Sequence, residues 1–419
     1  MTTSRELFER AKRVIPGGVN SPVRAFASVG GTPYFVARGQ GAHVWDTEGV
    51  RRIDLVQSYG AIIAGHAHPV IVEAVQRAAA DGTSYGAPTE REVLLAEAIC
   101  ERMPSIEMVR LVSSGTEATM SAVRAARGFT GRDKVVKFAG NYHGHGDLLL
   151  AEAGSGLAAL GLPGSAGVTA AAVADTVVAP YNVVPTLDDR IACVIVEPIA
   201  ANMGLIAPVD GFLKGLRAEC DRVGALLIFD EVITGFRVAY GGEQARSGVT
   251  PDLTTLGKVI GGGLNIGAYG GRTDVMHEIA PLGPVYQAGT LSGNPLATAA
   301  GLAALSLLDP AAHDALIATA ERLAAHLRHA FAEAHVPAVV TQEASLVGLY
   351  LGTDAPVDYI TAQRTDTQAY AQFFHAMLDR GVALAPGAYE VMFPGLAHED
   401  SIIDEVGAAA HAAAATLAS

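Results

Sequence analysis

Beyond residue 105, short apolar runs rich in β-branched residues alternate with longer stretches in which apolar residues recur at helical spacing. This alternation predicts an α/β fold built from βαβ units, with a mostly parallel sheet. The predicted strands are 108–112, 134–138, 192–196 and 225–229, and the predicted helices include 117–129, 212–223, 295–308, 315–334 and 367–380. Such sheets bind ligands beyond the carboxyl ends of their strands, so residues that follow a strand are the first candidates for a site.

Length and composition limit how the chain is organised. With 419 residues, half of them apolar and 17% charged, the chain is long enough for two or three domains of a compact enzyme. Alanine-rich helices with short strands between them begin near residue 310. We therefore predict a large domain at 61–309, a smaller α+β domain at 310–419, and an N-terminal segment, 1–60, that packs against the small domain.

The charge balance disfavours some partners. A net charge of −14 without a basic cluster argues against binding to nucleic acid or to anionic membranes. No apolar run has the length of a membrane span, and the N-terminus lacks the apolar stretch of a secretory signal, so we expect a cytoplasmic protein. Cys100, Cys193 and Cys220 have no metal-ligand spacing and are expected to be reduced, buried thiols.

The segment DLTTLGKVIGGGLNIGAYGG, residues 252–271, places a lysine between an apolar run and three glycines. It is not a P-loop, because Asp252 and Val259 stand where that motif needs Gly and Ser or Thr, and G-x-G-x-x-G cannot be fitted to it. At the end of an apolar strand, Lys258 would be poorly hydrated, with a lowered pKa and an amine free to attack a carbonyl. The alternative is a surface lysine in a turn.

Two further segments place polar groups after predicted strands. Ser114, Gly115 and Thr116 begin a helix, whose free N–H groups and dipole favour a phosphate, although a simple helix cap has the same pattern. Asp230 follows an apolar strand and would need a cationic partner if buried, unless it only caps the next turn.

A phosphate cup, a carboxylate and an amine match the phosphate, ring nitrogen and aldehyde of pyridoxal phosphate. Tyr142, in GNYHGHGD, is a candidate to stack on the ring, and simple packing is the alternative.

The chain resembles, over nearly its whole length, the fold-type I pyridoxal-phosphate enzymes of the class-III aminotransferase family. The resemblance depends on PGGVNSPVRAF (16–26), GHAHP (65–69), SSGTEATMSAVR (113–124), YHGH (142–145), EPIAANMG (197–204), LLIFDEVITGFR (226–237), LGKVIGGG (256–263), GAYGGR (267–272) and GPVYQAGTLSGNPLA (283–297).

The resemblance implies a role for each matching residue. Lys258 would be the Schiff-base lysine and proton carrier, Asp230 would bind the ring nitrogen, and Tyr142 and Val232 would cover the two faces of the ring. Ser114, Gly115 and Thr116 would hold the phosphate. Thr290 would reach it from the partner subunit of a homodimer. The substrate would meet Arg24, which would hold its carboxylate, together with Tyr59, Ser155, Asn202 and Glu390.

The first and last of these motifs resemble the aminomutases of the family. Such enzymes use the pyridoxamine form of the cofactor to exchange an amine within glutamate 1-semialdehyde, and they yield 5-aminolevulinate for tetrapyrrole synthesis. Residues 381–419 contain no Arg or Lys for a second substrate carboxylate, and Glu390 would repel one. The alternatives are an ω-amine or β-amino-acid transaminase and, in another class, a non-catalytic pyridoxal-phosphate-binding regulatory protein.

Residues 154–180 are rich in Gly, Ala and Ser and contain one charged residue, Asp175. This composition favours a lid that would retain the substrate, with an ordinary surface excursion as the alternative.

Some residues depart from the family pattern, and two histidine pairs raise the question of a metal site. Tyr59, Ala166, Asn265 and 385–393 differ from the usual family sequence, and they concern the substrate pocket and the lid. The histidine pairs at 66 and 68 and at 143 and 145 have no evident third ligand, so we expect no metal.

Overall fold

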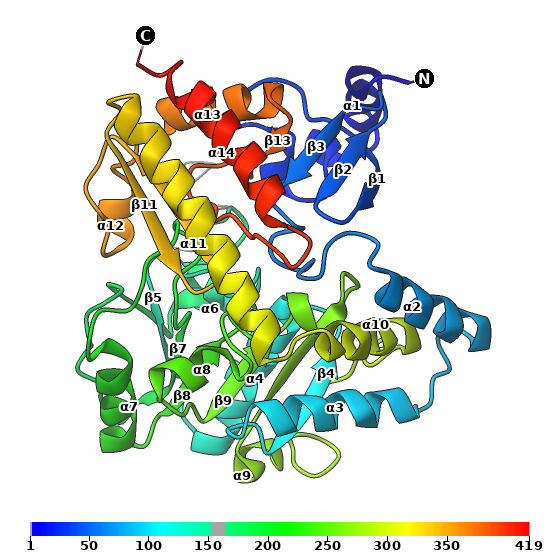
Figure 1. The fold of residues 1–419 in the computed structure, drawn as a ribbon. Coiled ribbons are helices and arrows are strands. Elements are labelled where there is room, and N and C mark those ends of the chain that lie inside the picture. The colour runs from blue at the N-terminus through cyan, green and yellow to red at the C-terminus, as the bar shows by residue number, and fades with distance from the viewer. Residues whose placement is uncertain (1, 152–163, 419) are drawn as a thin grey trace.

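The large sheet has seven strands in the order β4-β10-β9-β8-β7-β5-β6 (Figure 1). The computed structural model describes residues 2–151 and 164–418. The strands are β4 Met108–Val112, β5 Lys134–Phe138, β6 Thr176–Ala179, β7 Ile191–Val196, β8 Leu226–Asp230, β9 Leu253–Leu256 and β10 Gly267–Gly271. All run parallel except β10, which is antiparallel to both of its neighbours.

Helices cover both faces of this sheet. Successive side chains of a strand point to opposite faces, so the apolar side chains on each face need a layer of helices to bury them. In β8, Leu227 and Phe229 pack in one core with helix α7 (Phe212–Val223). Leu226 and Ile228 pack in the other core with α4 (Gly115–Thr130). Every residue of β7 and β8 is buried, which explains their continuous apolar sequence.

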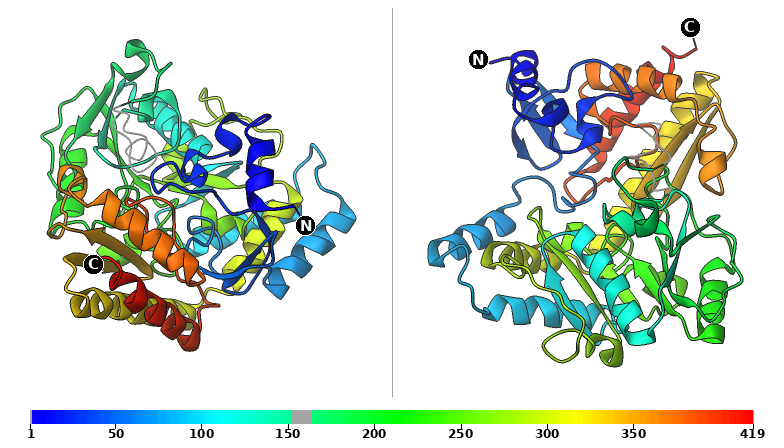
Figure 2. Two further views of the ribbon diagram at one scale, coloured as in Figure 1. Left: turned by 90° about the horizontal axis from the view of Figure 1, so that it is seen from above. Right: turned by 180° about the vertical axis from the view of Figure 1, so that it is seen from behind.

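A second sheet joins the two ends of the chain. Strands β1 Val36–Gln40, β2 His43–Asp46 and β3 Arg51–Asp54 form its antiparallel part, and β13 Val382–Ala383 pairs in parallel with β3. Phe26 and Ile53 share one apolar core with Leu323 and Phe374 of the C-terminal part. Figure 2 shows the blue N-terminal segment beside the orange and red C-terminal helices. We propose the boundaries 1–60, 61–309 and 310–419 on this basis.

The remaining α-helices and strands among the described residues are seven longer helices, four short helices and a two-stranded sheet. The longer helices are α1 Ser4–Ala11, α2 Pro69–Asp81, α3 Glu90–Arg102, α10 Pro295–Ser306, α11 Pro310–Glu333, α13 Thr367–Asp379 and α14 Asp400–Ala414. The short ones are α6 Ala170–Val173, α8 Gly242–Ser247, α9 Thr273–Met276 and α12 Tyr359–Ala362, and β11 Ala338–Glu343 pairs with β12 Leu346–Leu351. No single helix of the described residues has both the length and the apolar composition to cross a membrane, and only the bent pair α10 and α11 meets these criteria together.

The four strands and five helices predicted from the sequence are confirmed, with small shifts at some ends. The lid predicted at residues 154–180 is only partly described by the structure. Residues 152–163 lie outside the described residues, and 176–179 form β6, which pairs with β5 as a packed edge strand. That part of the lid prediction is wrong, because Val177 and Val178 align in register with Val136 and Lys137 of the sheet.

Gly267, the first residue of β10, packs closely against the backbone of Ser114, which precedes α4. A side chain at this position would collide with the carbonyl oxygen of Ser114, which lies on backbone that cannot rotate away. We expect Gly267→Ala to lower the free energy of unfolding by about 1–3 kcal/mol through overpacking. Urea denaturation followed by circular dichroism measures this.

The matched control is Gly146→Ala, since a methyl group there would meet no atom within 4 Å. Equal stability of the two variants would show that the sheet tolerates movement at Gly267.

Candidate active site

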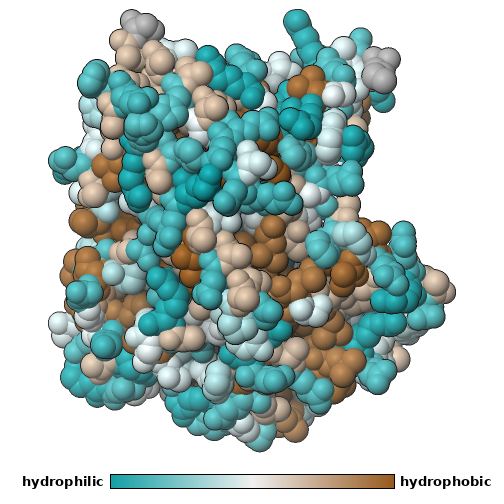
Figure 3. Space-filling view, viewed as in Figure 1, coloured by the Kyte–Doolittle hydropathy of each residue, from teal (hydrophilic) through white to brown (hydrophobic). Residues whose placement is uncertain are grey.

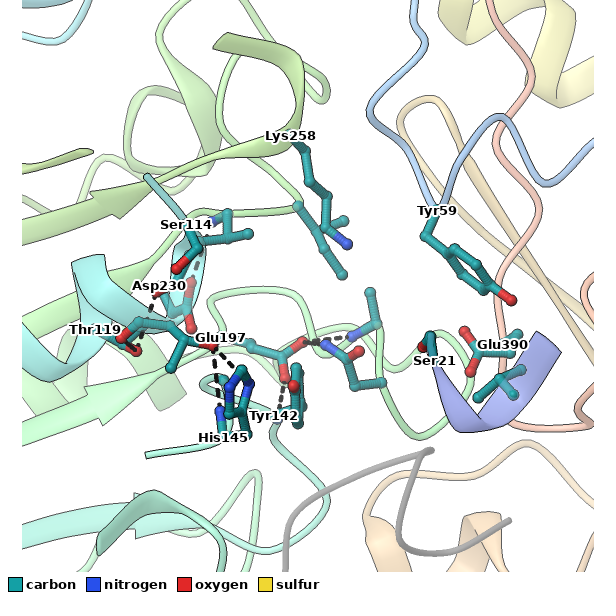
Figure 4. Close-up of a pocket in the computed structure, with 18 of the residues that line it drawn as sticks. Ser21, Tyr59, Ser114, Thr119, Tyr142, His145, Glu197, Asp230, Lys258 and Glu390 are labelled. Carbon is teal, nitrogen blue, oxygen red and sulfur yellow. Dashed lines mark hydrogen bonds between the residues drawn. The ribbon is translucent and has the colours of Figure 1, made fainter. Parts of the chain in front are cut away.

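A cavity of about 730 Å³ opens at the carboxyl edge of the large sheet. Strands β7 and β8 lead into it, the first turn of α4 forms part of its wall, and residues 20–23 of the N-terminal segment close it from the other side. Ten residues predicted from the sequence line it: Tyr59, Ser114, Gly115, Thr116, Tyr142, Asn202, Asp230, Val232, Lys258 and Glu390. Figure 4 shows Ser114, Asp230 and Lys258 on one side, with Ser21, Tyr59 and Glu390 opposite.

Asp230, the last residue of β8, is buried and held from three directions. Its Oδ2 lies 2.7 Å from Nδ1 of His143, and its Oδ1 accepts hydrogen bonds from the Thr255 hydroxyl at 3.0 Å and from the Val232 N–H at 3.1 Å. Burial lowers the pKa of His143, although Asp230 acts against this shift. These contacts orient the carboxylate and do more than cap a turn.

A second buried carboxylate, Glu197, lies beside the first. It accepts hydrogen bonds from the N–H groups of Tyr142 at 2.6 Å and Ala201 at 2.9 Å, and from the Asn202 amide at 3.0 Å. Burial raises its pKa to about 7, against the influence of these donors. Glu197 therefore positions two residues that line the cavity, Tyr142 and Asn202 (Figure 4).

The N-terminus of α4 faces the same cavity. Ser114 is the helix cap, and its Oγ accepts a hydrogen bond from the Glu117 N–H at 3.2 Å. Thr116 Oγ1 lies 3.2 Å from Nδ1 of His145 and accepts a hydrogen bond from the His145 N–H at 3.3 Å. A side chain at Gly115 would press against Val232 at 3.2 Å. The capping role does not exclude an anion site, since one cap leaves other N–H groups of the first turn available to a ligand.

Lys258 follows β9 and projects into the cavity (Figure 4). Its φ of 47° lies in the left-handed region, which is strained for a residue with a side chain and is often found at functional sites. Burial lowers its pKa below the ordinary 10.5, and nearby carboxylates, Glu390 first among them, act in the opposite direction. The amine is therefore easier to deprotonate than an exposed lysine, as a nucleophile requires.

Three predicted site residues are not among the lining residues. Arg24 is exposed next to the lining residues 20–23. Burial raises the pKa of Tyr59, and the charge of Arg24 acts against this rise. Thr290 is exposed outside the cavity, and Ser155 lies outside the described residues.

Two important residues had no assigned role in the sequence analysis. Glu197 directly follows a predicted strand, so the rule that singled out Asp230 could have found it. His143 was considered only as a metal ligand, whereas the structure pairs it with Asp230.

The residues present suit a phosphorylated pyridine aldehyde. The helix N-terminus can hold its phosphate, Asp230 can meet its ring nitrogen, and Lys258 can reach its aldehyde from within one cavity. The three carboxylates of the cavity, Asp230, Glu197 and Glu390, also favour a ligand that carries an amine.

Comparison with known proteins agrees with this geometry. The family described as aminotransferase class-III matches residues 26–412. The chain therefore belongs to the class-III aminotransferase family.

Individual relatives are more specific. The chain is 56% identical to the "Glutamate-1-semialdehyde 2,1-aminomutase" of Roseiflexus castenholzii (strain DSM 13941 / HLO8), over 97% of this chain and 96% of the relative. Its fold matches an ω-transaminase from Sphaerobacter thermophilus with a TM-score of 0.91 and 36% identity, over 99% and 97% of the two chains. It also matches a glutamate-1-semialdehyde-aminomutase from Pseudomonas aeruginosa PAO1 in complex with PMP, with a TM-score of 0.87 and 26% identity over 98% and 93%.

The lowered pKa of Lys258 predicts its reactivity in the unliganded protein. Since only the neutral amine is nucleophilic, we expect its acetylation rate to rise with pH to a midpoint below 10.5. Brief acetylation at a series of pH values, followed by peptide mass spectrometry, measures that midpoint.

Glu390→Gln removes the carboxylate that most favours the charged amine, so it should move the midpoint lower still. A midpoint at or above 10.5 in the parent would contradict the effect of burial.

Proposed function

We propose that the chain is a glutamate-1-semialdehyde 2,1-aminomutase that converts its substrate to 5-aminolevulinate with pyridoxal phosphate. One observation favours the aminomutase over a transaminase that uses a dicarboxylate acceptor. Among the described residues that line the cavity, Lys258 is the only lysine or arginine, and Glu390 lies on the opposite wall. A dicarboxylate acceptor such as 2-oxoglutarate would meet a carboxylate where it needs a second cation. The 56% identical aminomutase relative supports the same choice.

The cofactor, when bound, supplies an aldehyde that takes up amines and a protonated ring that withdraws electrons. The chain's own residues would orient it. Asp230 would keep a proton on the ring nitrogen, with His143 and Thr255 fixing the carboxylate. The N–H groups of the first turn of α4 would bind the phosphate, and Thr116 would add its hydroxyl. Lys258 would bind the aldehyde at rest and carry protons between substrate carbons during turnover.

Substrate recognition would fall to the opposite wall. Arg24 would hold the single carboxylate of the substrate, while Glu390 and Asn202 would contact its amine and oxygen. Tyr59, whose φ of 56° is also left-handed, would place its ring over the entrance. A reaction in which the amine leaves and returns requires the substrate to be retained between its two halves, and we assign this role to Ser155 and the part of the predicted lid that precedes β6.

We further propose a homodimer in which Thr290 completes the phosphate site of the partner subunit. The segment around Thr290 exposes large apolar side chains, with Leu282 66%, Tyr286 72% and Leu291 53% exposed. Val93 and Leu94 of α3 are exposed as well. Figure 3 shows apolar surface on the lower half of the molecule, where α3 and α10 lie. Exposed apolar surface of this extent is typical of an interface.

The activity is tested with glutamate 1-semialdehyde as the only amine source. We expect 5-aminolevulinate to form without an added acceptor, and 2-oxoglutarate to be a weak or inactive acceptor. Lys258→Ala should lower the rate by at least a thousandfold, since it removes the proton carrier and nucleophile.

Lys214→Ala, which removes an exposed lysine of α7, is the matched control and should retain the parental rate. Brisk transamination of 2-oxoglutarate with an ω-amine or β-amino acid, without product from the semialdehyde, would favour the transaminase alternative.

The dimer is tested by sedimentation equilibrium. We expect the parent to have twice the chain mass of 43.1 kDa. Tyr286→Asp should shift it toward the monomer, because a charge buried at an apolar interface loses its hydration.

Ile360→Asp is the control, since Ile360 is 66% exposed on α12 of the small domain. A parental protein that sediments as a monomer at micromolar concentration would overturn the shared site.

A further inference from the structure

Helices α11 and α14 lie side by side in the small domain, and both views show them running along one another (Figures 1 and 2). Ion pairs fix their relative direction. Arg322 of α11 pairs with Asp404 of α14 at 2.7 Å, and Glu333, further along α11, lies 3.0 Å from His411, further along α14. Contacts later in α11 meet later residues of α14, so the helices are parallel and their C-terminal ends lie together.

At this common end, three metal-ligating side chains converge. His329 and Glu333 are four residues apart on α11 and therefore share one face of the helix. His411 comes from the last turn of α14. His329 Nε2 lies 3.1 Å from Glu333 Oε1, and His411 Nδ1 lies 3.0 Å from Glu333 Oε2. One ligand atom from each residue lies within 4.8 Å of the others.

We propose that His329, Glu333 and His411 form a binding site for a divalent transition-metal ion of the zinc type. Two imidazoles and one carboxylate are a donor set that zinc accepts, with water in the remaining position. With metal–ligand bonds of about 2.0–2.1 Å, the edges of a coordination tetrahedron are about 3.3 Å long. Each imidazole nitrogen lies about one such edge from a different oxygen of Glu333, at 3.1 Å from Oε1 for His329 and at 3.0 Å from Oε2 for His411, so the carboxylate lies between the two histidines as a shared ligand would.

The surroundings favour a cation. Glu333 is the last residue of α11 and His411 lies in the last turn of α14, so the negative ends of two helix dipoles point toward the site. The side chains of His329 and Glu333 are 62% and 58% exposed, which leaves room for an ion to enter and for water to complete its shell.

The site is separate from the active-site cavity, because none of its three residues lines that cavity. It also differs from the histidine pairs at 66 and 68 and at 143 and 145, on which the expectation of no metal depended. An ion here would join the ends of α11 and α14 and thereby stabilise the small domain, since binding to the folded state alone raises its stability.

Isothermal titration of the pyridoxal-phosphate-loaded protein with Zn²⁺, in a buffer that does not chelate, tests the proposal. We expect one saturable site per chain and a thermal midpoint that rises with Zn²⁺. Each of His329→Ala, Glu333→Gln and His411→Ala should weaken binding by about tenfold or more, because each removes one ligand. In the Cu²⁺-loaded protein, electron paramagnetic resonance should show coupling to two imidazole nitrogens, and to one in His411→Ala.

The control is His277→Ala, since His277 is an exposed histidine beside α9 in the large domain and should leave the affinity unchanged. The three test positions are surface side chains, and retention of the cofactor absorbance confirms that each variant is folded. No saturable binding to the parent, or equal affinity in the parent and all three variants, would overturn the proposal.

Discussion

A carboxylate that is removed from water needs hydrogen bonds within the protein to replace those of hydration. Asp230, buried at the end of β8 in the large sheet, is such a carboxylate. Its oxygens are met by His143, Thr255 and the Val232 N–H, which come from three segments around the end of β8. Because each of these segments also lines or supports the cavity, the hydrogen bonds that stabilise the buried charge also fix the shape of the site. Burial also lowers the pKa of the Lys258 amine and outweighs the charge of the same carboxylate, which acts to raise that pKa.

The opposite wall depends on a different constraint, the pairing of the two ends of the chain. Strand β13 joins β3 in parallel, and this pairing carries Glu390 and Tyr59 to the same side of the cavity. The large sheet thus supplies the groups suited to a cofactor, while the terminal segments supply those suited to a substrate. Family members can then share the first set and differ in the second, which agrees with a fold match to an ω-transaminase and higher identity to an aminomutase.

Much of the large sheet could be predicted, because strands buried on both faces must be continuously apolar, and β7 and β8 are fully buried and lie within one residue of their predicted bounds. Strand β10 was not predicted as an antiparallel insertion between β4 and β9. Its sequence, GAYGG, is a weak strand former. The glycines are there because side chains at Gly267, Gly270 and Gly271 would collide with backbone carbonyls of neighbouring segments. That crowding exists only in the assembled sheet.

The sequence alone determined the strand–helix alternation and the types of group at the strand ends, because both follow from local apolar pattern and from the rule that parallel strands end at one edge. It therefore placed Ser114, Asp230 and Lys258 in one site. Only the tertiary structure decided that Glu197 holds Tyr142 and Asn202, that His143 faces Asp230, and that His329 and His411 meet across two helices. These partners are far apart in the chain, and their contacts arise from packing, which no local pattern specifies.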